Sequence, residues 1–306
     1  MNKLNIFFVF ILWMAIGLQS CGTKESLELN LKPGMDYHLN TQTYFEGEKT
    51  LMGQKQLSNL DLTQNIKFHV LRFENNEYQG LLTFPKMILN VNLNVGVLTI
   101  NSEEPNENPL SHVFAAMKNE GLNVSIDKKG NVKLGQSMDE YFDHILNVLQ
   151  IATFTLEDKL ELKAQLLEQF NDRSIQSQLE QFTKIAPAQS VKHGSKWKLE
   201  YNQTEPVGGK LENQYEIIDS TNLTWTVSIT GNLNPDKKAA PVEVQGYETK
   251  FKMKGDLIGE IVIDKVSGWP IEGNLNQNYQ GELLMQVNDK ETKVPATIKA
   301  ETILKP

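Results

Sequence analysis

The sequence predicts an α+β fold, rich in antiparallel β-sheet, with a helical segment in the middle of the chain. Apolar and polar residues alternate with a period of two before residue 135 and again after residue 191, which is typical of strands with one wet face. Between these regions the apolar residues recur at helical spacing. Two short patterns also recur in the same order in both β-regions. We therefore expect two related β-halves, which could form a half-barrel, packed on a central helical segment.

The chain is long and apolar enough to bury a large core. It has 306 residues, of which 40% are hydrophobic, and a net charge of −8. The acidic balance, without clusters of Lys and Arg, argues against nucleic acid and against anionic headgroups as partners. The expected parts are a lipoprotein signal peptide at 1–20, a lipidated tether at 21–26, an N-terminal β-half at 27–135, a helical insert at 136–190 and a C-terminal β-half at 191–306.

The first twenty residues have the features of a cleaved export signal. Lys3 supplies the positive charge, and residues 6–18 form an apolar run broken only by Gly17. A helix of this length spans about 20 Å, which is short of the roughly 30 Å hydrocarbon core of a bilayer. We therefore favour a signal peptide over a permanent membrane-spanning anchor.

Cys21 is the expected site of lipidation. The signal ends in Leu18, Gln19 and Ser20, which precede Cys21 as a lipobox, and Cys21 is the only cysteine in the chain. Its sulfur would carry a thioether-linked lipid, and no disulfide framework is possible. The sequence thus predicts a protein anchored by lipid in the cell envelope. Gly22 lacks the Asp that resembles an inner-membrane retention signal, so the outer membrane is favoured, on its periplasmic or its surface side.

The N-terminal β-half contains regular alternations. Residues 37–43 and 66–70 alternate, and an Asn75-Asn76 turn follows the second run. In residues 89–95 the apolar side chains alternate with Asn90, Asn92 and Asn94. Because Asn is a poor strand former, this ladder suggests either a solvated sheet face or a polar ligand surface. We favour the solvated face.

Capping residues locate the helices. Asn108 and Pro109 indicate a helix that ends before Gly121, and Ser137 begins a capping box for a second one. Two further helices are expected at about 155–170 and 174–184. Their leucine-rich stripes are interpreted as core. After Val191 the alternation returns at 197–201, 223–229, 247–253 and 294–300.

Two patterns support the internal repeat. Residues 32–39 and 192–199 both read K-x-G-x-x-aromatic-x-L. Further along, Asp127 and Asp264 each follow an isoleucine and precede a glycine. Each second pattern resembles a strand, a turn begun by Asp with a glycine in a special conformation, and another strand.

The residues Pro187, Val191, Gly194 and Trp197 form a P-x3-V-x2-G-x2-W pattern. Together with the lipobox, the early K-x-G-x-x-Y and the Gly-Asn-Val turn at 130–132, it resembles a family of uncharacterised Bacteroidetes lipoproteins about 300 residues long, with a domain of unknown function. Members often carry an acidic residue where this chain has Ser195. The resemblance implies location and fold but no catalytic residues. The architecture alone is similar to the lipoprotein-carrier fold.

No motif indicates catalysis, and we expect a protein that is not an enzyme and holds no metal or cofactor. Glu140 and His144 share a helix face, but a solvated helix turn explains them better than a metal does. Asp36, Asp127 and Asp264 could act as acids or bases, yet turn formation is the better interpretation of the last two. A hydrolase is the least favoured function class.

The favoured function is therefore that of a lipid-anchored envelope protein that binds an apolar or amphiphilic ligand. Its partners would be the membrane, through the lipid on Cys21, and a lipid-like ligand or an envelope protein. The alternative is a structural or protein-interaction component of the outer membrane, which would expose an apolar patch. The expected apolar ligand contacts are Trp197, Trp225, Phe251 and Met253.

Overall fold

The computed structural model describes residues 25–51, 53–93, 96–149, 155–203, 209–235, 241–244, 247–287 and 290–306. The expected signal peptide, the lipobox and Cys21 lie outside the described residues, as do most of the tether and Asn94 of the asparagine ladder.

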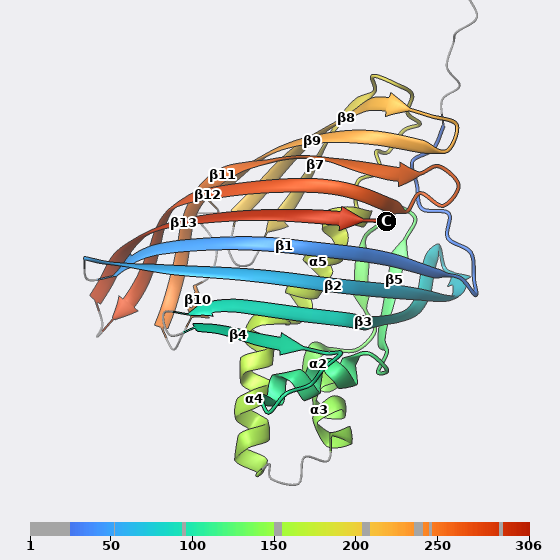
Figure 1. The fold of residues 1–306 in the computed structure, drawn as a ribbon. Helices are drawn as coiled ribbons and strands as arrows, with labels where there is room; N and C mark the ends of the chain where they lie inside the picture. Colours follow the sequence, from blue (N-terminus) through green and yellow to red (C-terminus); the bar gives the residue numbers. More distant parts are fainter. Residues whose placement is uncertain are drawn as a thin grey trace, which may run out of the picture.

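One antiparallel sheet of 13 strands forms the body of the protein, as the alternation predicts (Figure 1). The strands are β1 (Asp36–Leu51), β2 (Gln54–Glu74), β3 (Glu77–Leu93), β4 (Gly96–Asn101), β5 (Leu122–Asp127), β6 (Val132–Leu134), β7 (Lys196–Gln203), β8 (Gly209–Ser220), β9 (Thr224–Pro235), β10 (Val242–Val244), β11 (Tyr247–Asp264), β12 (Pro270–Val287) and β13 (Lys290–Lys305). The helices are α2 (Pro109–Met117), α3 (Met138–Val148), α4 (Leu156–Gln169) and α5 (Asp172–Thr183).

The strand order is β6-β5-β3-β2-β1-β13-β12-β11-β9-β8-β7, with β4 beside β3 and β10 beside β11. The two expected β-halves thus lie side by side in one continuous sheet. They meet where β1 pairs with β13, from Asn40 opposite Lys305 to Lys49 opposite Ala296. The strands β6 and β7 are left at the two edges of the order.

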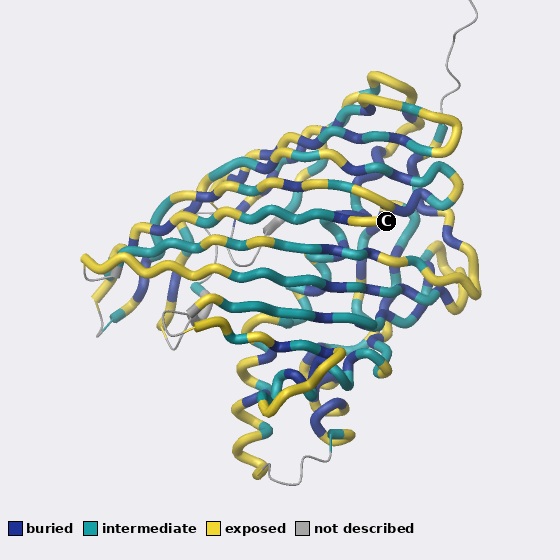
Figure 2. The backbone as a smooth tube through the Cα atoms, viewed as in Figure 1, coloured by how far each residue is buried: buried dark blue, intermediate teal, exposed yellow. Residues whose placement is uncertain are grey.

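The sheet curves around α5, and alternate residues of its strands are buried on the inner side (Figures 1 and 2). In β8 and β9, for example, Tyr215, Ile217, Val227 and Ile229 are buried, while their neighbours are more exposed. The asparagine ladder lies on the opposite side, where Asn92 is exposed and Asn90 accepts a hydrogen bond from Thr99. The one-sided burial confirms an antiparallel sheet with one wet face.

The helices begin at the capping residues. Asn108 caps α2, and the predicted capping box of Ser137 opens α3. The predicted start of the last helix at Ser174 was wrong, because α5 begins two residues earlier. The side chain of Asn171 accepts a hydrogen bond from the backbone N–H of Ser174 and so caps the helix before it.

Helix α5 and the residues directly after it fill the seam between the edge strands β6 and β7. Toward β6, Glu180 accepts a hydrogen bond from the backbone N–H of Val132 at 3.0 Å, and the Thr183 hydroxyl donates to the carbonyl of Gly130 at 2.8 Å. Toward β7, the indole N–H of Trp197 donates to the carbonyl of Ile185 at 2.9 Å. The helix therefore satisfies backbone groups beside the β6 edge, and the residues after it accept a hydrogen bond from a side chain of β7.

An N-terminal segment, residues 25–35, crosses the end of the sheet at which the chain enters it. Its side chains Leu27, Leu29 and Leu31 are buried. The N–H of Leu29 donates to the carbonyl of Lys128, and the N–H of Asn30 donates to the carbonyl of Ser267. The segment thus ties the β5–β6 turn to the β11–β12 turn and closes this end of the core.

The repeated sequence patterns form matching turns. Gly34 and Gly194 have φ angles of +81° and +79°. The N–H of Gly34 donates to the carbonyl of Val70 in β2, and the N–H of Gly194 donates to the carbonyl of Ile217 in β8. In the second pattern the Asp127 carboxylate accepts backbone hydrogen bonds from Lys129 and Asn131. The Asp264 carboxylate likewise accepts from the N–H and hydroxyl of Ser267. Both carboxylates are engaged within their own turns.

Gly130 is the position where the seam tolerates no side chain. A Cβ atom there would lie 1.9 Å from the carbonyl oxygen of Thr183, and the φ of Gly130 is +84°. At Gly34 the φ is similar, but nothing lies within 4 Å of the Cβ position. Alanine substitutions at Gly34 and Gly130 therefore separate the effect of backbone conformation from that of the close approach to α5.

We expect Gly34→Ala to lower the free energy of unfolding by roughly 1 kcal/mol through backbone strain. Gly130→Ala should lower it by roughly 3 kcal/mol or more, because the turn and the end of α5 must also separate. Urea unfolding followed by circular dichroism measures both. Equal losses would show that α5 is free to shift away from β6.

Candidate functional site

A cavity of about 320 Å³ lies between α5 and the inner side of β7, β8, β9, β11 and β12. This volume is at the lower end of the range of small-molecule sites, roughly 300–1,000 Å³. Its apolar wall comes from the sheet, where inward positions of four strands supply aliphatic side chains. These side chains are Leu211, Ile229, Leu257 and Leu275.

The polar wall of the cavity comes from α5 and β7. Glu180 and Lys184 form an ion pair at 3.2 Å one helical turn apart. Gln181 lies near Gln277 of β12, with 3.5 Å between the Oε1 and Nε2 atoms. Tyr201 of β7 completes this side, whereas the exposed carboxylate of Glu200 pairs with Lys210. The cavity therefore places charged and amide groups opposite an aliphatic surface.

Asn213 of β8 is a buried residue that lines the cavity, and only the nitrogen of its side-chain amide is hydrogen-bonded within the described residues. Its Nδ2 donates to the Tyr215 hydroxyl at 3.1 Å, whereas its Oδ1 has no hydrogen-bond partner in the described part of the chain. A Cβ atom on Gly231 would come within 2.2 Å of that Oδ1, so the glycine makes room for the amide. A buried acceptor left unpaired costs about 1–3 kcal/mol, and this one belongs to a residue that lines the cavity.

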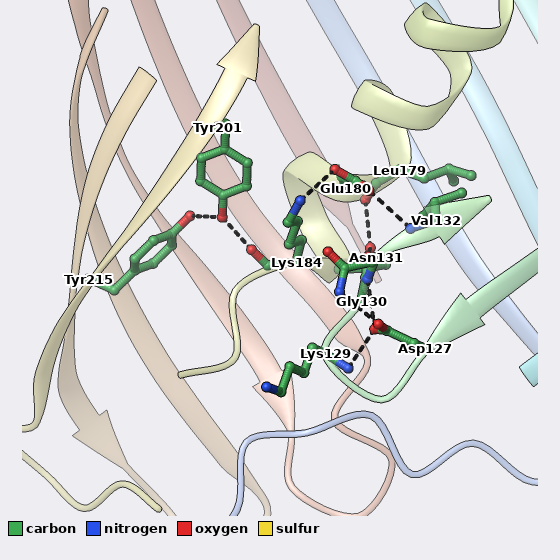
Figure 3. A network of polar contacts seen from close by, with 11 residues as sticks. Asp127, Lys129, Gly130, Asn131, Val132, Leu179, Glu180, Lys184, Tyr201 and Tyr215 are labelled. Carbon is green, nitrogen blue, oxygen red and sulfur yellow. Dashed lines mark hydrogen bonds and ion pairs between the residues drawn. The ribbon is translucent and has the colours of Figure 1, made fainter. Parts of the chain in front are cut away.

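A chain of hydrogen bonds runs from Asn213 to the end of α5. Figure 3 shows its part from Tyr215 through Tyr201 to Lys184. The Tyr215 and Tyr201 hydroxyls are 2.6 Å apart, and the Tyr201 hydroxyl donates to the carbonyl of Lys184. Because that donor is used, Tyr215 donates to Tyr201 and accepts from Asn213. The direction of the chain leaves the Asn213 oxygen as its free end.

Burial raises the pKa of both tyrosines. For Tyr201 and for Tyr215, removal of the hydroxyl from water is the largest cause of the raised pKa. Both phenols are therefore neutral at physiological pH. They act as hydrogen-bonding groups that orient Asn213 rather than as phenolate bases.

The four apolar contacts expected from the sequence lie elsewhere, and none is among the residues that line this cavity. Trp197 stacks on Tyr215 with ring centroids 5.4 Å apart, and its indole N–H donates to the carbonyl of Ile185 after α5. Trp225 is buried beneath the ammonium group of Lys265, which lies 3.8 Å from the ring centroid. Met253 is buried in the core, and Phe251 packs against it partly exposed.

Sequence reasoning missed the residues that line the cavity, although one signal was present. In β8 the inward positions are Leu211, Asn213 and Tyr215, so an amide interrupts an otherwise apolar row. A polar residue at a buried position of a strand needs a partner or a role. Glu180 and Lys184 gave no such signal. They fall between the apolar positions that form the core stripe of α5, as the residues of a solvated helix face do.

The other acidic and histidine candidates lie on the surface. His144 pairs with Glu120 at 2.9 Å, while Glu140 accepts a hydrogen bond from the N–H of Ser137 in the capping box. Asp36 pairs with His69 at 2.6 Å, and this hydrogen bond lowers the pKa of Asp36. Within the described ranges, no group of three or more His, Cys, Asp or Glu side chains could hold a metal ion.

None of the helices in the described part of the chain combines the length and the apolar character needed to cross a bilayer.

The raised pKa values of Tyr201 and Tyr215 predict a loss of stability in alkali. The unfolded chain loses tyrosine protons above about pH 10, whereas the folded protein keeps those of Tyr201 and Tyr215, so the free energy of unfolding falls as the pH rises. Tyr215→Phe should make this fall less steep, by up to about 1.4 kcal/mol per pH unit. Urea unfolding between pH 9 and about pH 11.5 measures the slopes. Identical slopes for the two proteins would show that the Tyr215 hydroxyl is open to water.

Three solved structures to which this chain is similar share little sequence identity with it. A structure titled "Lipid-protein interactions in lipovitellin" has a TM-score of 0.46 and 12% identity, over 90% of this chain and 26% of that one. The chain thus spans about a quarter of lipovitellin. OccK5 (OpdH) of Pseudomonas aeruginosa has a TM-score of 0.21 at 9% identity, over 90% of this chain and 99% of that one. A putative outer membrane lipoprotein-sorting protein domain from Vibrio parahaemolyticus has a TM-score of 0.12 at 9% identity, over 87% and 83%.

At these TM-scores none of the three structures supports a conclusion about activity. A search of curated proteins found no match. The sequence profile of a family of unknown function, DUF6263, matches residues 75–270, which run from the turn after β2 to the first residue of β12. This match covers more than half of the chain, so the protein belongs to the DUF6263 family of unknown function.

Proposed function

We propose that this protein is a lipid-anchored binding protein of the cell envelope, not an enzyme, and that it holds a small amphiphilic ligand in the cavity beneath α5. The observation that carries the proposal is the unpaired Oδ1 of Asn213 beside an aliphatic wall. An apolar cavity with a few convergent polar groups is the usual form of a small-molecule site.

The cavity sets the chemistry of the ligand. Leu211, Ile229 and Leu257 offer contacts to an apolar group. The free oxygen of Asn213 requires a donor, which a hydroxyl or an amide N–H of the ligand would supply. A volume of about 320 Å³ is equivalent to on the order of ten water molecules in the liquid. The ligand group is therefore a short acyl or ring system with a donor, rather than a whole phospholipid.

The contacts of the polar wall favour binding over catalysis. Glu180 is held by Lys184 and by the backbone N–H of Val132, and these bonds serve the seam. The Tyr201 hydroxyl is committed to the carbonyl of Lys184. Groups that are already paired within the structure are suited to orient a ligand rather than to transfer its protons.

The leader and the position of the N-terminal segment support the proposed envelope location. The lipobox at Leu18, Gln19 and Ser20 ends at Cys21, the single cysteine. The first described residue, Glu25, lies four residues after the proposed lipid and exchanges backbone hydrogen bonds with Val191. We favour the outer membrane, with its periplasmic and surface sides both open.

Native mass spectrometry of the protein purified from its own envelope tests the binding proposal. We expect an added mass of a few hundred daltons that is released on denaturation. Asn213→Leu removes the free acceptor and should weaken binding by roughly 5- to 150-fold, as expected for about 1–3 kcal/mol. Thr83→Val is the matched control, because Thr83 also has a buried unpaired oxygen but does not line the cavity.

A ligand that survives Asn213→Leu at full occupancy would place its site outside this cavity. A bare mass for the wild-type protein in all preparations would contradict ligand binding. It would favour the alternative role as a structural or protein-interaction component of the outer membrane, to be tested by crosslinking.

Cys21→Ser tests the anchor separately. Without the thiol no thioether lipid forms, and we expect the protein to move from the membrane fraction to the soluble fraction. Fractionation and the mass of the N-terminal peptide measure this change. A membrane-bound Cys21→Ser protein would show that something other than the lipid holds it there.

A further inference from the structure

Exposed apolar side chains gather at one end of the sheet, where the N-terminal segment crosses it. Large apolar side chains are normally scattered singly on a protein surface, and a group of them in one region marks an interaction site. The members of this group, which we call the apolar tips, are Met35, Leu71, Phe73, Ile218, Leu223, Val266 and Ile271.

The strand pairing places the apolar tips together. Asp36 pairs with His69 and Asp264 pairs with Thr224, so the turns beside these residues lie at the same end of their strands. Glu77 pairs with Asp127, which brings the β2–β3 and β5–β6 turns to this end as well. Figure 2 shows exposed turns along this end of the sheet, near the C-terminus.

The N-terminal segment holds these turns as one unit. It hydrogen-bonds to the β5–β6 turn at Lys128 and to the β11–β12 turn at Ser267, and the side chain of Asn30 donates to Val266. The backbone N–H of Lys265 donates to the carbonyl of Leu223, which joins the β8–β9 turn to the same group. The apolar tips are therefore displayed on connected backbone rather than on independent loops.

The length of the tether brings this end to the membrane. Glu25 is fixed to Val191, and Cys21 is only four residues before it. Four extended residues span at most about 14 Å. If Cys21 carries a lipid in the bilayer, Glu25 is held within that reach of its surface, and the end of the sheet that the N-terminal segment crosses is the part of the body tied to it.

The charges at this end suit an uncharged or zwitterionic surface better than an anionic one. Lys32, Lys128, Lys129, Lys192 and Lys265 are offset by acidic groups that include Glu25, Glu28, Asp36, Glu74 and Asp219. The ammonium group of Lys128 lies 5.3 Å from the ring centroid of Phe73. A lysine in such a position can place its ammonium group among headgroups while its stem covers apolar surface.

We propose that the apolar tips dock into the interfacial layer of the bilayer that carries the Cys21 lipid, so that the protein lies with this end on the membrane. The proposal rests on the proposed lipid anchor. Insertion of several apolar side chains adds a second membrane contact to the acyl chains and fixes the orientation of the cavity relative to the membrane.

Spin-label depth measurements test the proposal on the full protein, extracted from its membrane and reconstituted into phosphatidylcholine vesicles. Leu223→Cys and Val266→Cys introduce a thiol at tips that are 69% and 58% exposed. Ile258→Cys is the matched control, because Ile258 is 55% exposed but lies in the middle of β11, away from the turns. The chain without an added cysteine reports any free thiol at Cys21.

We expect labels at 223 and 266 to collide more with oxygen and less with a water-soluble nickel complex than the label at 258. The mass of the N-terminal peptide from the same sample shows whether Cys21 is acylated. An acylated protein whose three labels are equally open to the nickel complex overturns the docking proposal and leaves the anchor intact. A chain without acylation whose labels at 223 and 266 still enter added vesicles supports docking and overturns the anchor. A chain without acylation whose labels stay in water overturns both.

Discussion

The rest of this structure depends on the way α5 fills the seam between the two edge strands β6 and β7. A curved sheet that does not close on itself leaves backbone groups exposed at β6 and β7, and such edges invite pairing with other chains. Glu180 and Thr183 bind one edge, while the carbonyls of Lys184 and Ile185 accept hydrogen bonds from Tyr201 and Trp197 on the other. The same helix and the inner side of the sheet line the cavity.

The seam and the cavity use the same residues, which connects stability with the candidate site. The hydrogen bonds that run from Lys184 through Tyr201 and Tyr215 end at Asn213. Because each donor in this chain is already directed toward the seam, the acceptor of Asn213 remains free at the cavity. The free acceptor at the cavity is thus a consequence of the hydrogen bonds that join β7 and β8 to the end of α5. A ligand that donates to Asn213 would extend a network that already holds the sheet together.

Local features of the chain could be predicted because they depend on neighbours in sequence. The cap at Asn108 and the capping box at Ser137 act within one helical turn, and the Asp127 and Asp264 turns are closed by their own carboxylates. The start of α5 was misplaced because Asn171 and Ser174 are both good capping residues, and only the backbone shows which one accepts the hydrogen bond. Trp197 and Trp225 were expected at a ligand, but indoles are equally suited to seal a seam or to pack under a lysine.

The sequence by itself determined the antiparallel character of the sheet, the helical middle of the chain, the glycine turns and the family to which the protein belongs. These follow from periodicity and from short patterns that need no distant partner. Only the tertiary structure decided that β1 pairs with β13, that α5 lies between β6 and β7, and that Asn213 faces a cavity. Each of these contacts joins residues far apart in the chain, and alternation specifies which face of a strand is buried but not which strand or helix lies against it.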